Sequence, residues 1–152
     1  MKAEDKLKEM GITLPEPAKP VAAYVPAIVS KGLVYTAGQI PLQGGQLTYK
    51  GKVGQELSLE QGYEAAKVCV INCLAAIKGV LGSLDRVTRI VKVVGFVNSA
   101  PGFTDQPKVI NGASELLVQV FGEQGKHARS AVGVSELPLG AAVEVEVIAE
   151  FE

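Results

Sequence analysis

Apolar residues recur every three or four positions in two segments of the chain, the spacing that puts side chains on one face of an α-helix. In the first segment, Ser58 followed by Gln61 forms a capping-box sequence at the start, and Gly82 marks the end. In the second, Pro107 occupies the first helical turn and Gly122 follows the last apolar residue. The apolar positions are Leu59, Tyr63, Ala66, Val70, Cys73, Leu74, Ile77 and Leu81, and then Val109, Ile110, Ala113, Leu116, Leu117, Val120 and Phe121. We therefore predict two amphipathic helices.

Alternation of apolar and polar residues predicts a strand with one buried face at the C-terminal end. In residues 143–151 the odd positions are apolar and three of the even positions are glutamates. Residues 129–135 form a second run, in which Arg129 has only small residues beside it and is able to line a cavity. Pro138 marks a turn between the runs, so the simplest topology is an antiparallel hairpin. If Arg129 lies opposite an even-numbered residue, Glu144 projects from the same face.

The remaining apolar runs complete the predicted order of elements. Residues 25–29 and 33–37 are short β-rich runs that flank a Lys-Gly turn, and residues 42–55 contain four glycines and predict a loop with at most one edge strand. Residues 87–98 carry valine on both faces, as expected for a central strand that is covered on both sides by helix or by another subunit. The sequence therefore predicts an α+β single domain in which two helices pack on one mixed β-sheet.

The first 22 residues are predicted to form a helix and an arm, distinct from the main domain at residues 23–152. Residues 2–10 predict a short charged helix that ends at Gly11. The prolines that force an extended arm after it are Pro15, Pro17 and Pro20. The arm either lies across a neighbouring surface or is a loose tether.

Composition bears on partners and compartment. The chain is 47% hydrophobic and 20% charged, with a mean hydropathy of +0.24, which is compatible with a buried subunit interface. Fifteen basic and sixteen acidic residues give a net charge of −1, so no global field attracts nucleic acid. The longest uncharged apolar run, between Lys67 and Lys78, is too short to span a membrane, and residues 1–10 lack a signal-peptide hydrophobic region. We therefore expect a cytoplasmic protein.

The two cysteines, Cys69 and Cys73, are four positions apart in the first predicted helix. Because His127 is the only histidine, they do not belong to a zinc-ligand set with recognisable spacing, and no metal site is predicted. We predict that both are buried free thiols that act as small apolar residues. His127 itself is predicted to be a surface residue.

Arg129 and Glu144 have two interpretations at this stage. Most arginine and carboxylate pairs on one sheet face are solvated and form a weak ion pair. In the alternative, a fixed guanidinium grips a substrate carboxylate through two hydrogen bonds while Glu144 handles a proton or a water molecule. Spacing alone does not choose between them.

Two separated motifs of the chain resemble those of a known protein family. The run from Ala128 to Val132, then Leu137-Pro138 and residues 143–149, resembles the C-terminal signature of the YjgF-like family, whose best understood branch is reactive intermediate deaminase A (RidA). Upstream, residues 35–41 are similar to that family's strand and turn with a glycine, a glutamine and a proline. The resemblance extends from Tyr24 to the C-terminus. It implies the chorismate-mutase-like fold and a homotrimer with ligand sites in the clefts between subunits.

The resemblance also implies a chemistry. Arg129 would hold the carboxylate of a small imino or oxo acid, and Glu144 would position the attacking water. The reaction would hydrolyse a reactive 2-imino acid, formed from an enamine such as 2-aminoacrylate, to a 2-oxo acid and ammonia. It needs no cofactor, because a protonated imine is already electrophilic. The resemblance also implies three further substrate-binding residues, Tyr24, Gly38 and Asn111. The Tyr24 hydroxyl would orient the ligand, unless this residue only packs at a strand end, and the backbone of Gly38 would contact the ligand.

The chain departs from the deaminase branch at two places. Ala131 stands where that branch usually has a cysteine two residues after the arginine, so a thiol nucleophile is excluded here, and the N-terminal arm is an extension. Three functions follow: an imine hydrolase, a binding or regulatory module that senses a 2-oxo acid without turnover, and an endoribonuclease acting on mRNA. The near-neutral charge and the lack of a basic, aromatic-rich stripe argue against the third.

Overall fold

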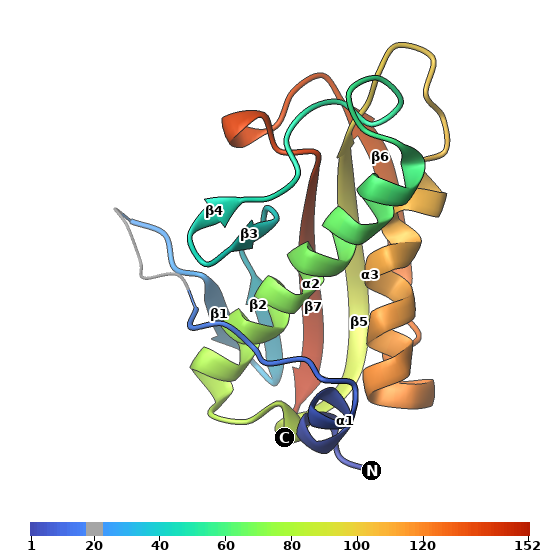
Figure 1. Cartoon of the computed structure of the whole chain (residues 1–152). Helices are drawn as coiled ribbons and strands as arrows, with labels where there is room; N and C mark the ends of the chain where they lie inside the picture. The colour runs from blue at the N-terminus through green and yellow to red at the C-terminus, as the bar shows by residue number, and fades with distance from the viewer. Residues whose placement is uncertain (18–22) are drawn as a thin grey trace.

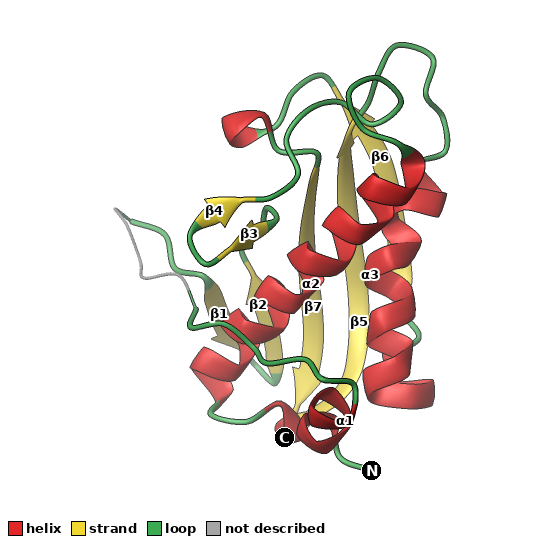
Figure 2. Ribbon diagram, viewed as in Figure 1, coloured by secondary structure: helices red, strands yellow, loops and turns green. Residues whose placement is uncertain are grey.

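A mixed β-sheet with helices on one face forms the protein (Figure 1). The computed structural model of the chain describes residues 1–17 and 23–152. The elements are α1 (Ala3–Glu9), β1 (Ala27–Ser30), β2 (Leu33–Thr36), β3 (Leu42–Gln43), β4 (Gln46–Leu47), α2 (Leu59–Leu81), β5 (Val87–Asn98), α3 (Gln106–Phe121), β6 (Ala128–Val134) and β7 (Val143–Phe151), with short 3-10 turns at Leu84–Arg86, Gly122–Gly125 and Pro138–Gly140. Figure 2 shows α2 and α3 lying side by side over the sheet. The predicted α+β class is confirmed.

The five strands of the sheet run in the order β1-β2-β7-β5-β6. Strands β5 and β6 are parallel, and the other neighbouring pairs are antiparallel. The predicted antiparallel hairpin of β6 with β7 is therefore wrong, because β5 lies between them. The succession β5, α3, β6 is a strand-helix-strand unit, whose crossover helix returns the chain parallel to its first strand.

The predicted helix signals are confirmed. Ser58 and Gln61 form a reciprocal capping box at the start of α2, and Gly82 ends this helix with φ of 87°. Helices α2 and α3 approach closely at Gly112, where an added Cβ would overlap the carbonyl group of Tyr63. One segment differs from its prediction: the glycine-rich loop contains a small two-stranded sheet, β3 with β4.

Helix α1 confirms the predicted N-terminal helix and is anchored to the core. Leu7 is buried, and the Glu4 carboxylate accepts hydrogen bonds from Lys78 Nζ at 2.5 Å and Ser83 Oγ at 2.6 Å. These contacts, the one with Lys78 first, lower the pKa of Glu4. The following chain packs against the same domain through Ile12 and Leu14. Residues 3–14 are thus not a loose tether; Pro20 and the predicted boundary at residue 22 lie outside the described residues.

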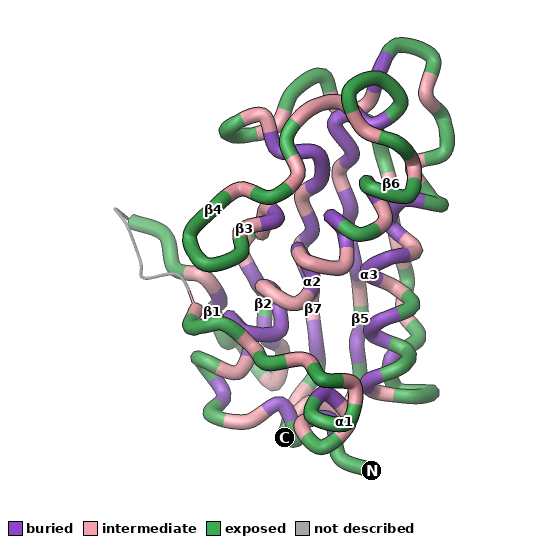
Figure 3. Tube along the Cα trace, in the orientation of Figure 1, coloured by how far each residue is buried: buried purple, intermediate pink, exposed green. Residues whose placement is uncertain are grey.

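The two faces of the sheet differ. The face under α2 and α3 holds the buried core, as the purple positions of Figure 3 show. The opposite face, called here the open face, has no covering layer among residues 1–17 and 23–152, and its Ile28, Tyr35 and Val132 are 59%, 37% and 44% exposed. Helices cover β5 on the helical face, as predicted, and coverage of its other face by another subunit stays a prediction. In the described part of the chain, no helix has the length and apolar character needed to cross a membrane.

Both thiols are buried, as predicted. The Sγ atoms of Cys69 and Cys73 donate to the carbonyl oxygens of Val143 at 3.4 Å and Val145 at 3.2 Å, so α2 holds the start of β7. Burial raises the pKa of the Cys73 thiol to about 12, and it raises that of Cys69 well above its ordinary value.

Neither thiol should therefore react with an alkylating reagent in the folded protein. Reaction needs both access and a thiolate, and the structure denies both. Mass spectrometry after iodoacetamide treatment should find no added group under native conditions and two in denaturant. Native alkylation of Cys69 or Cys73 with the fold intact would contradict this placement.

Candidate functional site

Arg129 lies near the start of the edge strand β6, on the helical face of the sheet. It pairs with Val93 of β5, whose partner on the other side is Val147, so the three side chains share that face. The guanidinium is partly buried, and its Nη1 donates to Asn111 Oδ1 at 2.9 Å and to Ser114 Oγ at 3.1 Å. The structure thus brings Arg129 and Asn111 together, because α3 presents Asn111 toward β6.

The rest of the Arg129 guanidinium is unoccupied by protein. Among residues 1–17 and 23–152, Nε and Nη2 have no hydrogen-bond partner and no carboxylate lies within 4.0 Å of the group. Nη1 uses both of its hydrogens on neutral acceptors. Nε and Nη2 form the edge that pairs with a carboxylate through two parallel hydrogen bonds. A partly buried cation without a counter-ion is suited to bind an anion.

His127 was missed as a member of this cluster. It is partly buried, so the prediction of a surface residue is wrong; its Nε2 lies 2.9 Å from Ser114 Oγ and its Nδ1 lies 2.7 Å from the Gly125 carbonyl oxygen. Burial, and then the nearby Arg129 charge, lower the pKa of His127. The two-residue period of an extended chain could have identified it: His127 precedes Arg129 by two residues, so both side chains are expected on the same face.

Glu144 lies on the open face, with Phe96 as its partner on β5. It is partly buried, and this burial, followed by repulsion from Glu146, raises the pKa of its carboxyl. A Cβ added to Gly38 would overlap the carboxylate and lie 2.8 Å from Glu144 Cδ. Backbone hydrogen bonds of the next residue, Gln39, keep Gly38 close to Glu144. The Gln39 N–H donates to Val145 O at 2.8 Å, and the Gln39 carbonyl accepts from Val145 N at 3.0 Å.

Tyr24 lies at the edge of the same region. Its side chain is 60% exposed. Two residues later, the Pro26 carbonyl accepts a hydrogen bond from Ala37 N at 2.8 Å, next to Gly38. The structure therefore places Gly38 beside Glu144, and the hydrogen bond between Pro26 and Ala37 brings the segment that follows Tyr24 close to Gly38.

The expectation that Glu144 and Arg129 project from one face is wrong within a protomer. Glu144 aligns with Phe96 and Val132 on the open face, whereas Arg129 aligns with Val93 on the helical face. The reason is the insertion of β5, which replaces the assumed direct pairing of β6 with β7. One protomer therefore carries two half-sites: Arg129 with Asn111, and Glu144 with Gly38.

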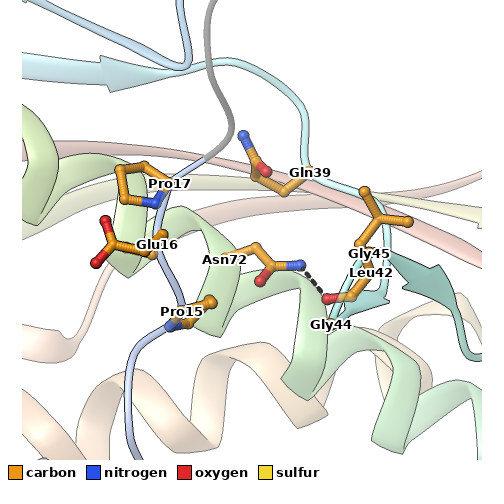
Figure 4. A pocket seen from close by; sticks show the side chains of 9 residues that line it. Pro15, Glu16, Pro17, Gln39, Leu42, Gly44, Gly45 and Asn72 are labelled. Atoms are coloured by element: carbon orange, nitrogen blue, oxygen red, sulfur yellow. Dashed lines mark hydrogen bonds between the residues drawn. The ribbon is translucent and has the colours of Figure 1, made fainter.

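Neither half-site coincides with the cavities beside the N-terminal arm. One cavity of about 370 Å³ lies between the arm, α2 and the β3–β4 segment, and Figure 4 shows its lining. Asn72 in its wall donates to the Ile40 and Leu42 carbonyl oxygens, both at 3.0 Å. An adjoining cavity of about 340 Å³ shares Leu42 and Asn72. Across the described ranges, no three His, Cys, Asp or Glu side chains are grouped to hold a metal ion.

Comparisons with known proteins agree on the fold and the family. Residues 4–151 match the family described as "YjgF/chorismate mutase-like, putative endoribonuclease". Protein TCP17 of Trypanosoma cruzi is 46% identical over 148 residues, covering 95% of this chain and 91% of that protein. A crystal structure of Atu1372, a protein of unknown function from Agrobacterium tumefaciens, is 43% identical with a TM-score of 0.92, covering 99% and 92% of the two chains. A "putative endoribonuclease" from Shewanella oneidensis MR-1 is 32% identical with a TM-score of 0.95, covering 99% and 100%.

Proposed function

Starting from the fact that this chain belongs to the YjgF/chorismate mutase-like family, we propose that it hydrolyses small reactive 2-imino acids to 2-oxo acids and ammonia. The observation that carries the proposal is the Arg129 guanidinium, which is partly buried, lacks a carboxylate partner in the described chain and keeps one edge for a ligand. A planar carboxylate on a small substrate matches that edge in charge and geometry.

Glu144 supplies the second part of the mechanism. A carboxylate with a raised pKa is a stronger base than an ordinary glutamate, which favours proton removal from water. The water oxygen adds to the carbon of the protonated imine while one water proton passes to Glu144, which gives a neutral carbinolamine. Glu144 then returns this proton to the amine nitrogen, the C–N bond breaks, and the remaining hydroxyl proton is lost as the carbonyl of the 2-oxo acid forms and ammonia leaves. No redox step is involved. The clamp on the carboxylate keeps the imine carbon in place for this attack.

The two half-sites meet only if a second copy contributes one of them, because one protomer presents Arg129 and Glu144 on opposite faces of its sheet. The uncovered apolar residues of the open face, including Ile28 and Val132, support burial against other copies. We propose a homotrimer with the site between subunits. Light scattering at micromolar concentration should give three times the chain mass; a monomeric mass would remove the intersubunit site.

The activity is tested by ammonia release from freshly generated 2-aminoacrylate, together with calorimetric titration of a 2-oxo acid. We expect the protein to accelerate release above the buffer rate and to bind the 2-oxo acid at the Arg129 edge. Release at the buffer rate would contradict the hydrolase.

A binding or regulatory module is the second candidate, and Ala131 is the observation that favours it, since the deaminase branch that the chain resembles usually has a cysteine there. A binding or regulatory module should bind a 2-oxo acid tightly without releasing ammonia from 2-aminoacrylate. The endoribonuclease named in the family description is disfavoured by the net charge of −1. RNA binding that weakens steeply with salt would support it.

Gly38 gives a further prediction about this site. In Gly38→Ala the new methyl group overlaps the Glu144 carboxylate and displaces it, so ammonia release should fall about 10- to 100-fold. A double-mutant cycle isolates the cause: adding Gly38→Ala to Glu144→Ala should have no further effect. Equal losses in both backgrounds would mean that Gly38 acts independently of Glu144.

A further inference from the structure

We infer that Ser114 and His127 are positioning residues that hold the Arg129 guanidinium in the orientation in which it binds a carboxylate. This inference deepens the proposed function and rests on the Arg129 clamp. Neither residue lies in the motifs that resemble those of the family, which are residues 35–41, 128–132, 137–138 and 143–149.

With the His127 ring neutral, the form that its lowered pKa favours, the hydrogens of the cluster have one consistent arrangement. A carbonyl oxygen only accepts, so His127 Nδ1 must donate to Gly125 O, 2.7 Å away. In the neutral ring, Nε2 is then an acceptor, and the Ser114 hydroxyl donates to it across 2.9 Å. The Ser114 oxygen is left to accept from Arg129 Nη1 at 3.1 Å. The order from backbone to cation is Gly125, His127, Ser114, Arg129.

This order fixes the direction of the Ser114 hydroxyl. A serine hydroxyl rotates freely and would otherwise present its hydrogen to the cation in some orientations. With His127 taking that hydrogen, a lone pair always faces Arg129 Nη1. Asn111 Oδ1 takes the second Nη1 hydrogen at 2.9 Å, so two acceptors on α3 set the plane of the guanidinium.

Arg129 needs such support because of its position. It lies on an edge strand, and the next residue on its face, Ala131, is too short to pack against its long side chain. An arginine held only at its backbone samples many rotamers, and ordering it on binding costs affinity. Fixing Nη1 in advance leaves Nε and Nη2 pointing in one direction.

The experiment measures 2-oxo acid affinity by calorimetry and KM and kcat by ammonia release. Ser114→Ala and His127→Ala should each weaken binding about 3- to 10-fold, the range of one neutral hydrogen bond, and raise KM more than they lower kcat. Ser114→Thr keeps a hydroxyl and His127→Gln keeps a side-chain acceptor, so each should restore part of the loss. Ser135→Ala, an exposed serine in the β6–β7 connection, is the matched control and should bind normally.

Binding measurements on the Arg129→Ala variant distinguish a failure of this inference from a failure of the proposed function. There, Ser114→Ala should have no further effect on binding, because its partner is absent. If Arg129→Ala itself binds normally, the carboxylate clamp is wrong. If Arg129→Ala binds poorly while Ser114→Ala and His127→Ala bind as wild type, or if the threonine variant is as weak as the alanine variant, the positioning role is overturned and the clamp stands.

Discussion

Arg129→Ala is expected to weaken 2-oxo acid binding about 10- to 150-fold, because it removes charged hydrogen bonds worth about 1.5 to 3 kcal/mol. The structure supports this size: Nη1 is committed to Asn111 and Ser114, and the Nε and Nη2 edge has no protein partner in residues 1–17 and 23–152. The loss should appear equally in kcat/KM. Calorimetric titration of the variant and the wild type measures it.

Arg129→Lys is the informative companion. An ammonium group keeps the charge but lacks the planar two-point contact, and the acceptors Asn111 Oδ1 and Ser114 Oγ would compete with the ligand for its hydrogens. The lysine variant should therefore resemble the alanine variant more than the wild type. Thermal melts check that both variants fold. Normal 2-oxo acid binding in a folded Arg129→Ala protein would refute the clamp.

Glu144→Gln is expected to lower turnover about 10²- to 10⁴-fold, the usual contribution of a general base, while 2-oxo acid binding is kept. The amide retains the shape of the side chain beside Gly38 but cannot take a proton from water. Unchanged ammonia release would remove the catalytic role and leave the binding module as the better function. Wild-type turnover should fall on acidification at a higher pH than an ordinary glutamate would give.

The same variant has a pH-dependent effect on stability. The folded state raises the pKa of Glu144, through burial and then Glu146, so folding favours the protonated carboxyl and the ionised form opposes folding. Glu144→Gln should thus stabilise the protein at neutral pH. The difference should vanish at acid pH, where the Glu144 carboxyl is protonated in both the folded and the unfolded wild type. Denaturant midpoints at the two pH values give the comparison. A destabilised variant at neutral pH would contradict this assignment.

Mixing the two inactive variants tests whether different subunits supply the two residues. In a cyclic trimer, each trimer that contains both Arg129→Ala and Glu144→Gln chains has one interface with neither change. Random reassembly of equal amounts should therefore recover about a quarter of wild-type turnover. No recovery after verified mixing would mean that Arg129 and Glu144 do not meet across an interface.

Local sequence determined much of this fold. Ser58 and Gln61 satisfy the first backbone groups of α2 between themselves, so the start of this helix depends on no distant contact. The tight turn between β1 and β2 has Lys31 and Gly32 at φ of 49° and 80°, a geometry that the Lys-Gly pair indicates. Alternation in residues 143–151 placed valines on the core face and glutamates on the other.

The sequence names the residues of the candidate site but does not predict their arrangement. Arg129 and Glu144 were assigned from the resemblance, and their common face was inferred from a hairpin that does not form. Period two fixes which side chains of one strand share a face, but it carries no information on which strand becomes the neighbour. That choice was made by the long apolar strand β5, which lies between β6 and β7 and separates the faces of Arg129 and Glu144.

The sequence by itself therefore determined helix ends, turns, strand periodicity and the burial of Cys69 and Cys73, because these depend on neighbours within a few residues or on hydrophobicity alone. Only the tertiary structure decided the contact of His127 with Ser114 and the close approach of Gly38 to Glu144. Both join residues from separate elements, and their geometry depends on strand order and on how closely α3 packs. Contacts of this kind arise from the fold as a whole and leave no local pattern.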